Sequence, residues 1–286
     1  MSEANESLIH ACRSGHPEAF DEAVAAGADV QAPAALLAAA THGHADLVRK
    51  LLALGAVADA ISALGVSALA IAAANGHVNV LRVLLDAGAD PEIRSEFDAA
   101  ALHQAIDHSR TDAAMLLIER GADIHTRGPW NSTALQTAVN RGESSVALAL
   151  IDRGADLEAR DDTGATALNH AAVNGRIDIV NALLAKDAKV DARTEQGLTP
   201  LQQAVGARQF EIAKALLAHG ADPRTVNEDG YSLLHTAVAS CRPPAVAFVL
   251  ELGQPLHTLR NGPGLTPLEL ARQLGSPEIV AMLAAH

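Results

Sequence analysis

The most regular feature of the chain is a pair of short apolar blocks that recurs with a fixed spacing. In residues 195–222 the first block opens with Thr199-Pro200-Leu201, and the second carries Leu216 and Leu217 and ends at Gly220-Ala221-Asp222. Apolar residues three and four apart in both blocks predict two short amphipathic helices. A glycine after such a block can take the left-handed conformation that ends a helix. The stretch therefore predicts helix, turn, helix and loop.

The same unit recurs along the whole chain. The leucine that opens the first helix is found nine times, and from Leu36 to Leu234 each step is 33 residues. These leucines are Leu8, Leu36, Leu69, Leu102, Leu135, Leu168, Leu201, Leu234 and Leu268. A period held this long predicts a repeat protein, in which each unit buries its apolar face against its neighbours.

The residues that carry the period resemble the ankyrin repeat family. The matching segments are the turn glycine and Thr-Pro-Leu of 197–201 and 264–268, Gly-His at 15–16, 43–44 and 76–77, and Gly-Ala-Asp after the second helix. The resemblance implies an all-α ankyrin-type α-solenoid of about nine helix-turn-helix repeats with projecting β-turn or hairpin fingers. We expect a single solenoid over residues 1–286, with an N-terminal capping repeat at 1–33, internal repeats at 34–253 and a C-terminal capping repeat at 254–286.

Three departures from the period carry structural predictions. Asp187 stands where most other copies have glycine, so we expect an aspartate in a left-handed, strained conformation. The step from Gly27 to Leu36 is shorter than in later copies, which predicts that no finger projects between the first two units. Cys241-Arg242-Pro243-Pro244 replaces the Gly-His of the turn between helices, which predicts an irregular turn there.

Composition and charge restrict the partners. The formal net charge is −13, and phosphate groups are bound by clustered Lys and Arg, so we expect neither nucleic acid nor a membrane surface as partner. A protein with a basic face is the better electrostatic complement. No apolar run approaches the length of a membrane span, the N-terminus lacks signal-peptide features, and Cys12 and Cys241 lie far apart in sequence. We expect a cytoplasmic monomer, with a secreted effector lacking a classical signal peptide as the alternative; the Ala-rich, Cys-poor composition favours a bacterial source.

The sequence contains no motif that predicts catalysis. We find no phosphate-binding loop, HExxH, CxxC pair or GxSxG, and so expect no enzyme and no cofactor. His42 and His44 are the best local candidates for metal ligands, but two histidines without a carboxylate or thiol make a poor site. His16, His44 and His77 each follow a turn glycine, which favours a structural role for them.

Candidate partner-binding residues lie in the predicted fingers. Three of the few aromatic residues, Phe97, Trp130 and Tyr231, fall in or beside fingers, and exposed Trp and Tyr are enriched at binding hot spots. The alternative is that Phe97 and Trp130, one repeat apart, pack on each other. Acidic residues at the finger tips are Glu96, Asp161, Asp162, Glu195, Glu228 and Asp229. Their alternative role is that of solvated turn residues.

Two further polar rows follow the repeat. The polar positions expected on the concave helices are Asp107, His108, Asn140, Arg141 and Asn174, with His42 and Asn75 at related positions. Such a row suits an extended peptide or protein loop better than an apolar cofactor. A basic row at the base of the fingers, Arg94, Arg127, Arg160, Arg193 and Arg260, is expected to be structural.

We interpret the chain as a non-catalytic protein–protein interaction scaffold, an adaptor, inhibitor or effector, that binds a protein partner through its concave face and finger turns. The expectation of protein binding comes from the family resemblance. The aromatic residues beside acidic ones indicate a partner with a basic and apolar surface. Two alternatives remain open at this point: a small-molecule or metal-sensing module that uses the concave histidines and acids, and a purely structural spacer.

Overall fold

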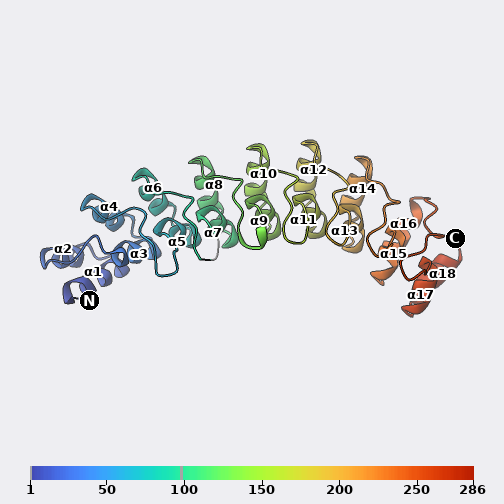
Figure 1. The fold of residues 1–286 in the computed structure, drawn as a ribbon, viewed down its shortest axis with the longest axis horizontal. Coiled ribbons are helices and arrows are strands. Elements are labelled where there is room, and N and C mark those ends of the chain that lie inside the picture. The colour runs from blue at the N-terminus through green and yellow to red at the C-terminus, as the bar shows by residue number, and fades with distance from the viewer. Residues whose placement is uncertain (1, 97–98) are drawn as a thin grey trace. The chain divides into compact units, whose positions relative to one another are not determined.

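The computed structural model describes residues 2–96 and 99–286, and the chain divides into two compact units, Met1–Ala155 and Asp156–His286. Each unit is built from consecutive helix pairs (Figure 1), and we describe each by itself. The single uninterrupted solenoid over 1–286 stays a prediction.

Unit 1 contains five helix pairs in its described residues. They are α1 (Glu3–Ser14), α2 (Pro17–Ala25), α3 (Pro33–His42), α4 (Ala45–Ala53), α5 (Ala68–Asn75), α6 (Val78–Asp86), α7 (Ala101–Asp107), α8 (Thr111–Glu119), α9 (Ala134–Arg141) and α10 (Ser144–Asp152), with a short 3-10 helix η1 (Pro129–Asn131) before α9.

Unit 2 contains four helix pairs. They are α11 (Ala167–Asn174), α12 (Ile177–Ala185), α13 (Pro200–Gly206), α14 (Phe210–Ala218), α15 (Leu233–Ala239), α16 (Pro243–Glu251), α17 (Pro267–Gln273) and α18 (Pro277–Ala284). The all-α fold and the repeat count are therefore as predicted. No helix in the described part of the chain has the length and apolar character needed to span a bilayer.

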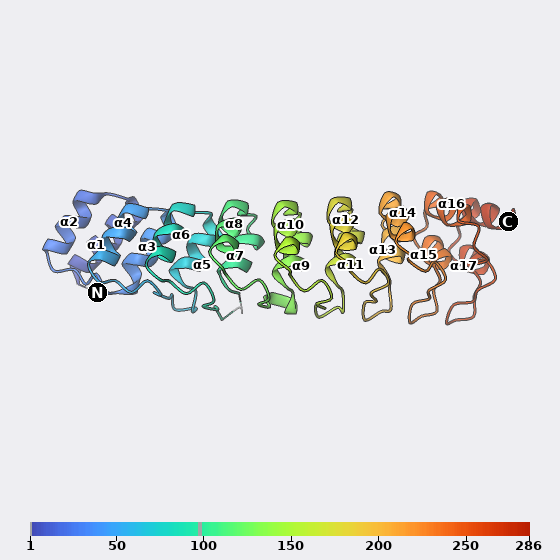
Figure 2. The same ribbon diagram turned by 90° about the horizontal axis from the view of Figure 1, so that it is seen from above.

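The helices of each unit form two layers. In unit 1 the first helices of successive pairs contact one another, α1 with α3, α3 with α5, α5 with α7 and α7 with α9, and the second helices form the outer layer. Unit 2 repeats the arrangement with α11, α13, α15 and α17 in its inner layer. The fingers of each unit extend from one edge of its helix layers (Figure 2). Two fingers close with single β-bridges, Ile61 with Ser67 and Arg127 with Thr133.

The recurring leucine is the core residue of each pair. Leu201 is 0% exposed and the equivalent leucines from Leu8 to Leu234 are buried, whereas Leu268 in the last pair is half-buried. Alanines such as Ala171 and Ala172 are fully buried and keep the inner helices narrow enough for close layers. The core is thin because each layer packs only on its neighbours.

Hydroxyl residues cap most of the inner helices, whereas α3 and α7 begin after Ala32 and Ala100 without a side-chain cap. Thr199 accepts a hydrogen bond from the backbone N–H of Gln202, and the Gln202 side chain accepts one from the Thr199 backbone N–H in return. The same reciprocal capping box is formed by the pairs Thr133/Gln136, Thr166/Asn169, Ser232/His235 and Thr266/Glu269. Each box satisfies backbone donors that the first helical turn leaves unbonded.

The structure also tests the three departures. Asp187 has φ 59°, so the left-handed conformation is confirmed. Helix α2 ends at Ala25 and α3 begins at Pro33, so no finger separates the first two pairs. At the turn after α15, Cys241 has φ 54° and keeps the left-handed position of Gly76, with φ 76°. The next residue departs from the regular copies, because Arg242 has φ −122° and ψ 109° where His77 has −81° and 72°. The turn is therefore irregular at Arg242 and regular at Cys241.

Candidate functional site

Trp130 is exposed to solvent on the finger that precedes α9. The Gly128 N–H donates to the Ser132 carbonyl at 2.8 Å and closes the finger around η1. Trp130 and Asn131 have φ values of 60° and 54°, and the Trp130 residue is 82% exposed. A bulky residue in the left-handed region is a backbone outlier, and such outliers concentrate at functional sites. Most tryptophans in folded proteins are largely buried, whereas Trp130 is exposed to solvent.

A cavity of about 250 Å³ lies beside this indole, between the finger and the inner helices. We call it the Trp130 pocket, and its lining residues are Asp107, Pro129, Trp130, Ser132, Thr137, Asn140 and Arg141. Four residues that the sequence analysis proposed for partner binding, Asp107, Trp130, Asn140 and Arg141, are thus brought together. The volume is below the roughly 300–1,000 Å³ of small-molecule sites. It suits one or two side chains of a larger partner.

The polar groups of the pocket are held in place. Arg141 Nε donates to Asp107 Oδ1 at 3.2 Å, across from α9 to the end of α7. The side chains are 54% and 28% exposed, so this ion pair is partly open to solvent and contributes little to stability. Ser132 Oγ donates to the Pro129 carbonyl at 2.6 Å and Thr137 Oγ1 to the Thr133 carbonyl at 3.1 Å. The wall therefore keeps its shape without a ligand.

The other two aromatic candidates lie elsewhere. Tyr231 is half-buried, its ring centroid is 5.6 Å from that of His235, and its carbonyl accepts from Gln202 Nε2 at 2.9 Å. Tyr231 is therefore part of the packing of unit 2. Phe97 lies outside the described residues, and so does the alternative that it packs on Trp130.

Five of the six acidic finger residues are exposed: Glu96, Asp162, Glu195, Glu228 and Asp229. The sixth, Asp161, corrects the expectation, because its side chain is only 8% exposed. It accepts hydrogen bonds from the Thr163 and Ala165 N–H groups at 2.8 and 3.1 Å and from His170 Nε2 at 2.6 Å. Burial acts to raise the pKa of Asp161, but the bonds from Thr163 and His170 outweigh it and lower the pKa below its usual value. Asp161 organises its own turn and offers little surface to a partner.

The remaining concave candidates, His108 and Asn174, lie at the ends of inner helices. His108 is exposed, and its Nδ1 lies 2.9 Å from the Gln104 carbonyl. Asn174 is exposed at the end of α11. Neither residue lines the Trp130 pocket. Polar side chains at the end of an inner helix can donate to backbone carbonyls of its last turn. Asn75 Nδ2, for example, donates to the Ile71 carbonyl at 3.0 Å.

The basic row at the base of the fingers links successive repeats. Arg94 donates to the Arg127 carbonyl, Arg160 to the Arg193 carbonyl and Arg193 to the Val226 carbonyl. Each bond joins residues 33 positions apart, that is, one repeat. These three arginines therefore link successive fingers within their units. Arg127 Nη1 donates instead to the Asn131 carbonyl at 2.8 Å and Arg260 Nη1 to the Gly264 carbonyl at 2.5 Å, each within its own finger.

The histidines after the turn glycines are structural as well. His44 Nε2 lies 3.0 Å from the Arg13 carbonyl and His77 Nε2 lies 2.9 Å from the Thr41 carbonyl. A carbonyl oxygen can only accept, so both rings carry the proton on Nε2. His42 Nδ1 bonds the Ala38 carbonyl at 2.9 Å. Among the described residues, no three His, Cys, Asp or Glu side chains are placed to hold a metal ion.

A comparison with known protein families agrees with the repeated helix pairs of the structure. The family described as "Ankyrin repeats (3 copies)" matches residues 8–95, 37–128, 102–194 and 188–258. The chain belongs to the ankyrin repeat family. Ankyrin repeats are in general protein–protein interaction modules and are typically non-catalytic. A search of curated protein sequences finds no significant match.

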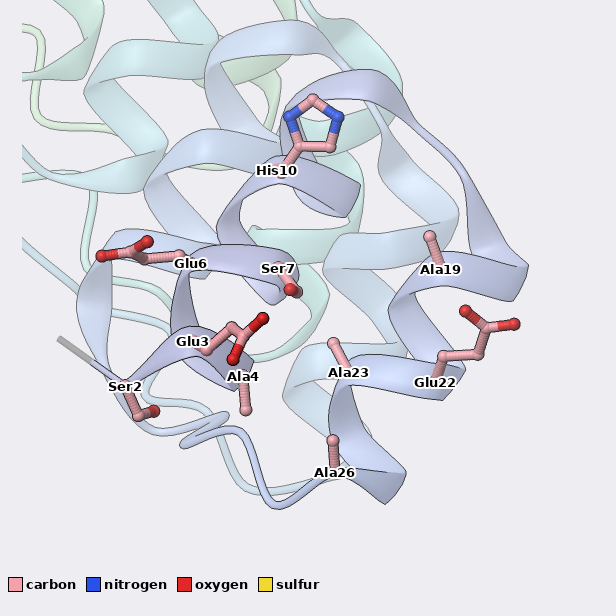
Figure 3. Close-up of a pocket in the computed structure, with 10 residues that line it drawn as sticks. All are labelled: Ser2, Glu3, Ala4, Glu6, Ser7, His10, Ala19, Glu22, Ala23 and Ala26. Carbon is pink, nitrogen blue, oxygen red and sulfur yellow. The ribbon is translucent and has the colours of Figure 1, made fainter.

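A second cavity of this ankyrin repeat protein is lined by residues of the first helix pair and its ends. It measures about 900 Å³ and opens between α1 and α2, on the face of the first repeat (Figure 3). Its lining includes Glu3, Glu6, Glu22 and His10, together with Ala4, Ala19, Ala23 and Ala26. It is a shallow acidic surface without an aromatic anchor, so we place the candidate site at the Trp130 pocket.

Sequence reasoning missed Leu64 and the small pocket residues Pro129, Ser132 and Thr137. Leu64 is 51% exposed at a finger tip. The repeat spacing could have identified Leu64, because positions 64, 97 and 130 follow one another at intervals of 33 residues. The pocket residues carried no signal, since only packing of the finger on α9 shows that they share a cavity.

Proposed function

We propose that this ankyrin repeat protein binds a protein partner through the fingers of unit 1, with Trp130 as the central anchor. One observation carries the proposal: the 82% exposed indole of Trp130 stands beside a pocket that Asp107, Asn140 and Arg141 also line. Tryptophan is among the residues enriched at the hot spots of protein interfaces.

Charge supports the chemistry of the partner. With a net charge of −13 the protein attracts a basic surface and repels phosphate-rich ligands. In unit 1, Glu96 adds an exposed carboxylate on the finger before Trp130. Glu195, Glu228 and Asp229 provide the corresponding acidic fingers of unit 2. A partner with apolar residues flanked by Lys or Arg fits this combination, as an adaptor, an inhibitor or an effector would require.

The experiment is a quantitative capture comparison. Wild-type protein, Trp130→Ala and the control Leu274→Ala are immobilised in equal amounts and the captured proteins are measured by mass spectrometry. Leu274 is a 43% exposed apolar residue of the last repeat, so its replacement controls for nonspecific binding to exposed apolar side chains. We expect specific partners to be retained by wild type and Leu274→Ala and lost by Trp130→Ala. Equal capture by Trp130→Ala would refute the proposed site.

A further inference from the structure

The finger between α4 and α5 exposes three large apolar side chains. Val57, Ile61 and Leu64 are 62%, 49% and 51% exposed and fall within eight residues of sequence. Later copies carry a charged residue at the position of Val57, namely Asp90, Asp123, Asp156, Lys189 and Asp222, and an arginine at that of Ile61, namely Arg94, Arg127, Arg160 and Arg193. Exposed apolar residues that cluster in this way mark an interaction surface. We call residues 57–67 the first finger.

The first finger has an open edge, because no finger precedes it in the chain. Helix α2 ends at Ala25 and α3 begins at Pro33, which leaves no room for one between the first two pairs. On its other side the next finger is bonded to it, since the Leu64 carbonyl accepts from the Glu96 N–H at 3.2 Å. The same contact recurs three times in unit 2, where the N–H groups of Glu195, Glu228 and Gly262 donate to the carbonyls of Thr163, Gln196 and Asp229.

Ala63 carries the equivalent backbone donor of the first finger, one repeat before Glu96. It is exposed, and its N–H has no hydrogen-bond partner among the residues that the structure describes. The repeat directs this N–H away from the second finger, towards the side on which a preceding finger would lie.

Such an edge is open to another chain. Unpaired backbone donors at an edge are templates for pairing, and charged side chains usually protect them. The first finger lacks that protection, because Ile61 and Val57 replace the charged residues of later copies. Its one charged residue, Asp59, accepts from the Asp90 N–H at 2.8 Å.

The contact between successive fingers indicates what covers this edge. In that contact a turn presents a tip carbonyl to the N–H of the neighbouring finger, so a covering turn needs a free tip carbonyl. It also needs apolar side chains, because the exposed side chains of Val57, Ile61 and Leu64 offer no charge to pair with.

The first finger of a second copy does not meet these requirements. Its Leu64 carbonyl already accepts from its own Glu96 N–H. Two Ala63 N–H groups facing each other are both donors and cannot bond. The covering turn therefore belongs to a different protein.

We propose that the open edge of the first finger binds an apolar turn of a partner protein, which continues the row of fingers. The tip carbonyl of that turn accepts from the Ala63 N–H, and its apolar side chains pack on Val57, Ile61 and Leu64. None of these residues lines the Trp130 pocket, so this is a second interaction surface beyond the proposed function.

The chain itself supplies the probes for a test. A backbone-cyclised peptide of residues 57–67 is an apolar turn with a free tip carbonyl, and a cyclised peptide of residues 189–199 has the same length and the turn glycine at the same position. In the second peptide Arg193 replaces Ile61 and Gln196 replaces Leu64, so its tip is polar.

Both peptides are labelled and titrated with the full chain, and binding is followed by fluorescence anisotropy. We expect saturable binding of the 57–67 peptide and binding weaker by about tenfold or more of the 189–199 peptide, which cannot bury the apolar side chains. Equal affinity for the two peptides, or no saturable binding of the first, would overturn the proposal.

A pair of variants tests the backbone bond. Ala63→Pro removes the N–H, and Pro129 already occupies the equivalent position of another finger, whereas Ala63→Ser keeps the N–H. Loss of one hydrogen bond should weaken binding of the 57–67 peptide about fivefold in Ala63→Pro, with wild-type affinity in Ala63→Ser. Circular dichroism melts check that both remain folded. Equal affinities of the two variants would overturn the proposal.

A double variant tests the apolar surface without disturbing the fold. Val57→Asp with Ile61→Arg restores the residues that later copies carry at these positions. Binding of the 57–67 peptide should weaken about tenfold or more, because the apolar contact is lost. Undiminished binding by this folded variant would overturn the proposal.

Trp130→Ala separates this proposal from the proposed function. It should bind the 57–67 peptide with wild-type affinity, and weakened binding would contradict a separate surface. If the peptide fails to bind wild type while Trp130→Ala loses captured partners, the proposal fails and the proposed function stands. If the peptide binds as expected while Trp130→Ala captures partners as wild type does, only the proposed function fails.

Discussion

The position between the two helices of a repeat shows how single residues adapt to a fixed backbone. Gly43, Gly76, Gly142 and Gly175 take the left-handed conformation there, and Ser109, Arg208 and Cys241 take it as well, with φ between 53° and 65°. The surrounding helix pair imposes this conformation, and each non-glycine residue accepts some strain. Tertiary packing thus overrides residue preference at these turns.

Asp187 gives a direct measure of that strain. Asp187→Gly should raise the free energy of unfolding by about 0.5–1 kcal/mol, because glycine adopts φ 59° without a Cβ clash. The reverse change Gly220→Asp, at φ 89° where a Cβ meets nothing within 4 Å, should lower it by a similar amount. Chemical denaturation of both variants makes the measurement. An unchanged or lowered stability of Asp187→Gly would contradict the strain.

His235 predicts a pH dependence of stability. It is 0% exposed, its Nε2 bonds the Leu265 carbonyl at 2.9 Å, and burial lowers its pKa below the usual value. Below pH about 6.5 the unfolded chain binds a proton that the folded chain resists, so the free energy of unfolding falls as the pH drops through this range.

The matched variant is His235→Gln, since Gln202 forms the same capping box in the preceding repeat. Denaturation at a series of pH values should show a shallower loss of stability below pH about 6.5 in the variant than in wild type. Parallel curves for the two proteins would show that His235 does not contribute.

At the scale of the element, a helix pair is stable only against its neighbours. The inner helices have seven to twelve residues, too short to be stable alone in water. Capping boxes and the buried leucine supply the missing stabilisation. Most of the helix positions and caps were predictable from the sequence, because the hydroxyl, the leucine and the final glycine recur at one spacing. The fate of Asp161 was not, because only the fold brings His170 to its carboxylate.

The buried leucine should dominate the stability of its pair. Leu201→Ala should lower the free energy of unfolding by about 2–5 kcal/mol, because the side chain is 0% exposed and leaves a cavity. Leu268→Ala, at the half-buried equivalent position of the last pair, should cost clearly less. Urea denaturation compares the two variants, and equal losses would argue against the burial account.

At the scale of the whole molecule, the main helix contacts among the described residues of each unit join successive pairs. Helix α13 contacts α11, α14 and α15. Stability in such an array is a sum of local terms, so perturbations spread over a limited distance. For the same reason, a substitution at the tip of one finger should leave the packing of the helices unchanged.

Because stability is local, a core mutation should destabilise only the helices near it. In Leu201→Ala, hydrogen exchange followed by mass spectrometry should accelerate in α11, α13, α14 and α15, while α1 to α8 keep their wild-type rates. The physical reason is that the lost packing is shared only with neighbouring helices. Uniform acceleration along the chain would instead indicate one cooperative unit, as an uninterrupted solenoid of high cooperativity would show.

The sequence by itself determined the family, the helix pairs, their caps and the core leucines, because these depend on local spacing that repeats many times. Trp130 and the acidic fingers were recognisable as candidates for the same reason. Only the tertiary structure decided which side chains face solvent: it turned Asp161 inward, engaged Tyr231 in packing, and placed Asp107, Asn140 and Arg141 beside Trp130. Residues of different repeats meet only when the layers stack. Exposure and neighbourhood are therefore properties of the packed array.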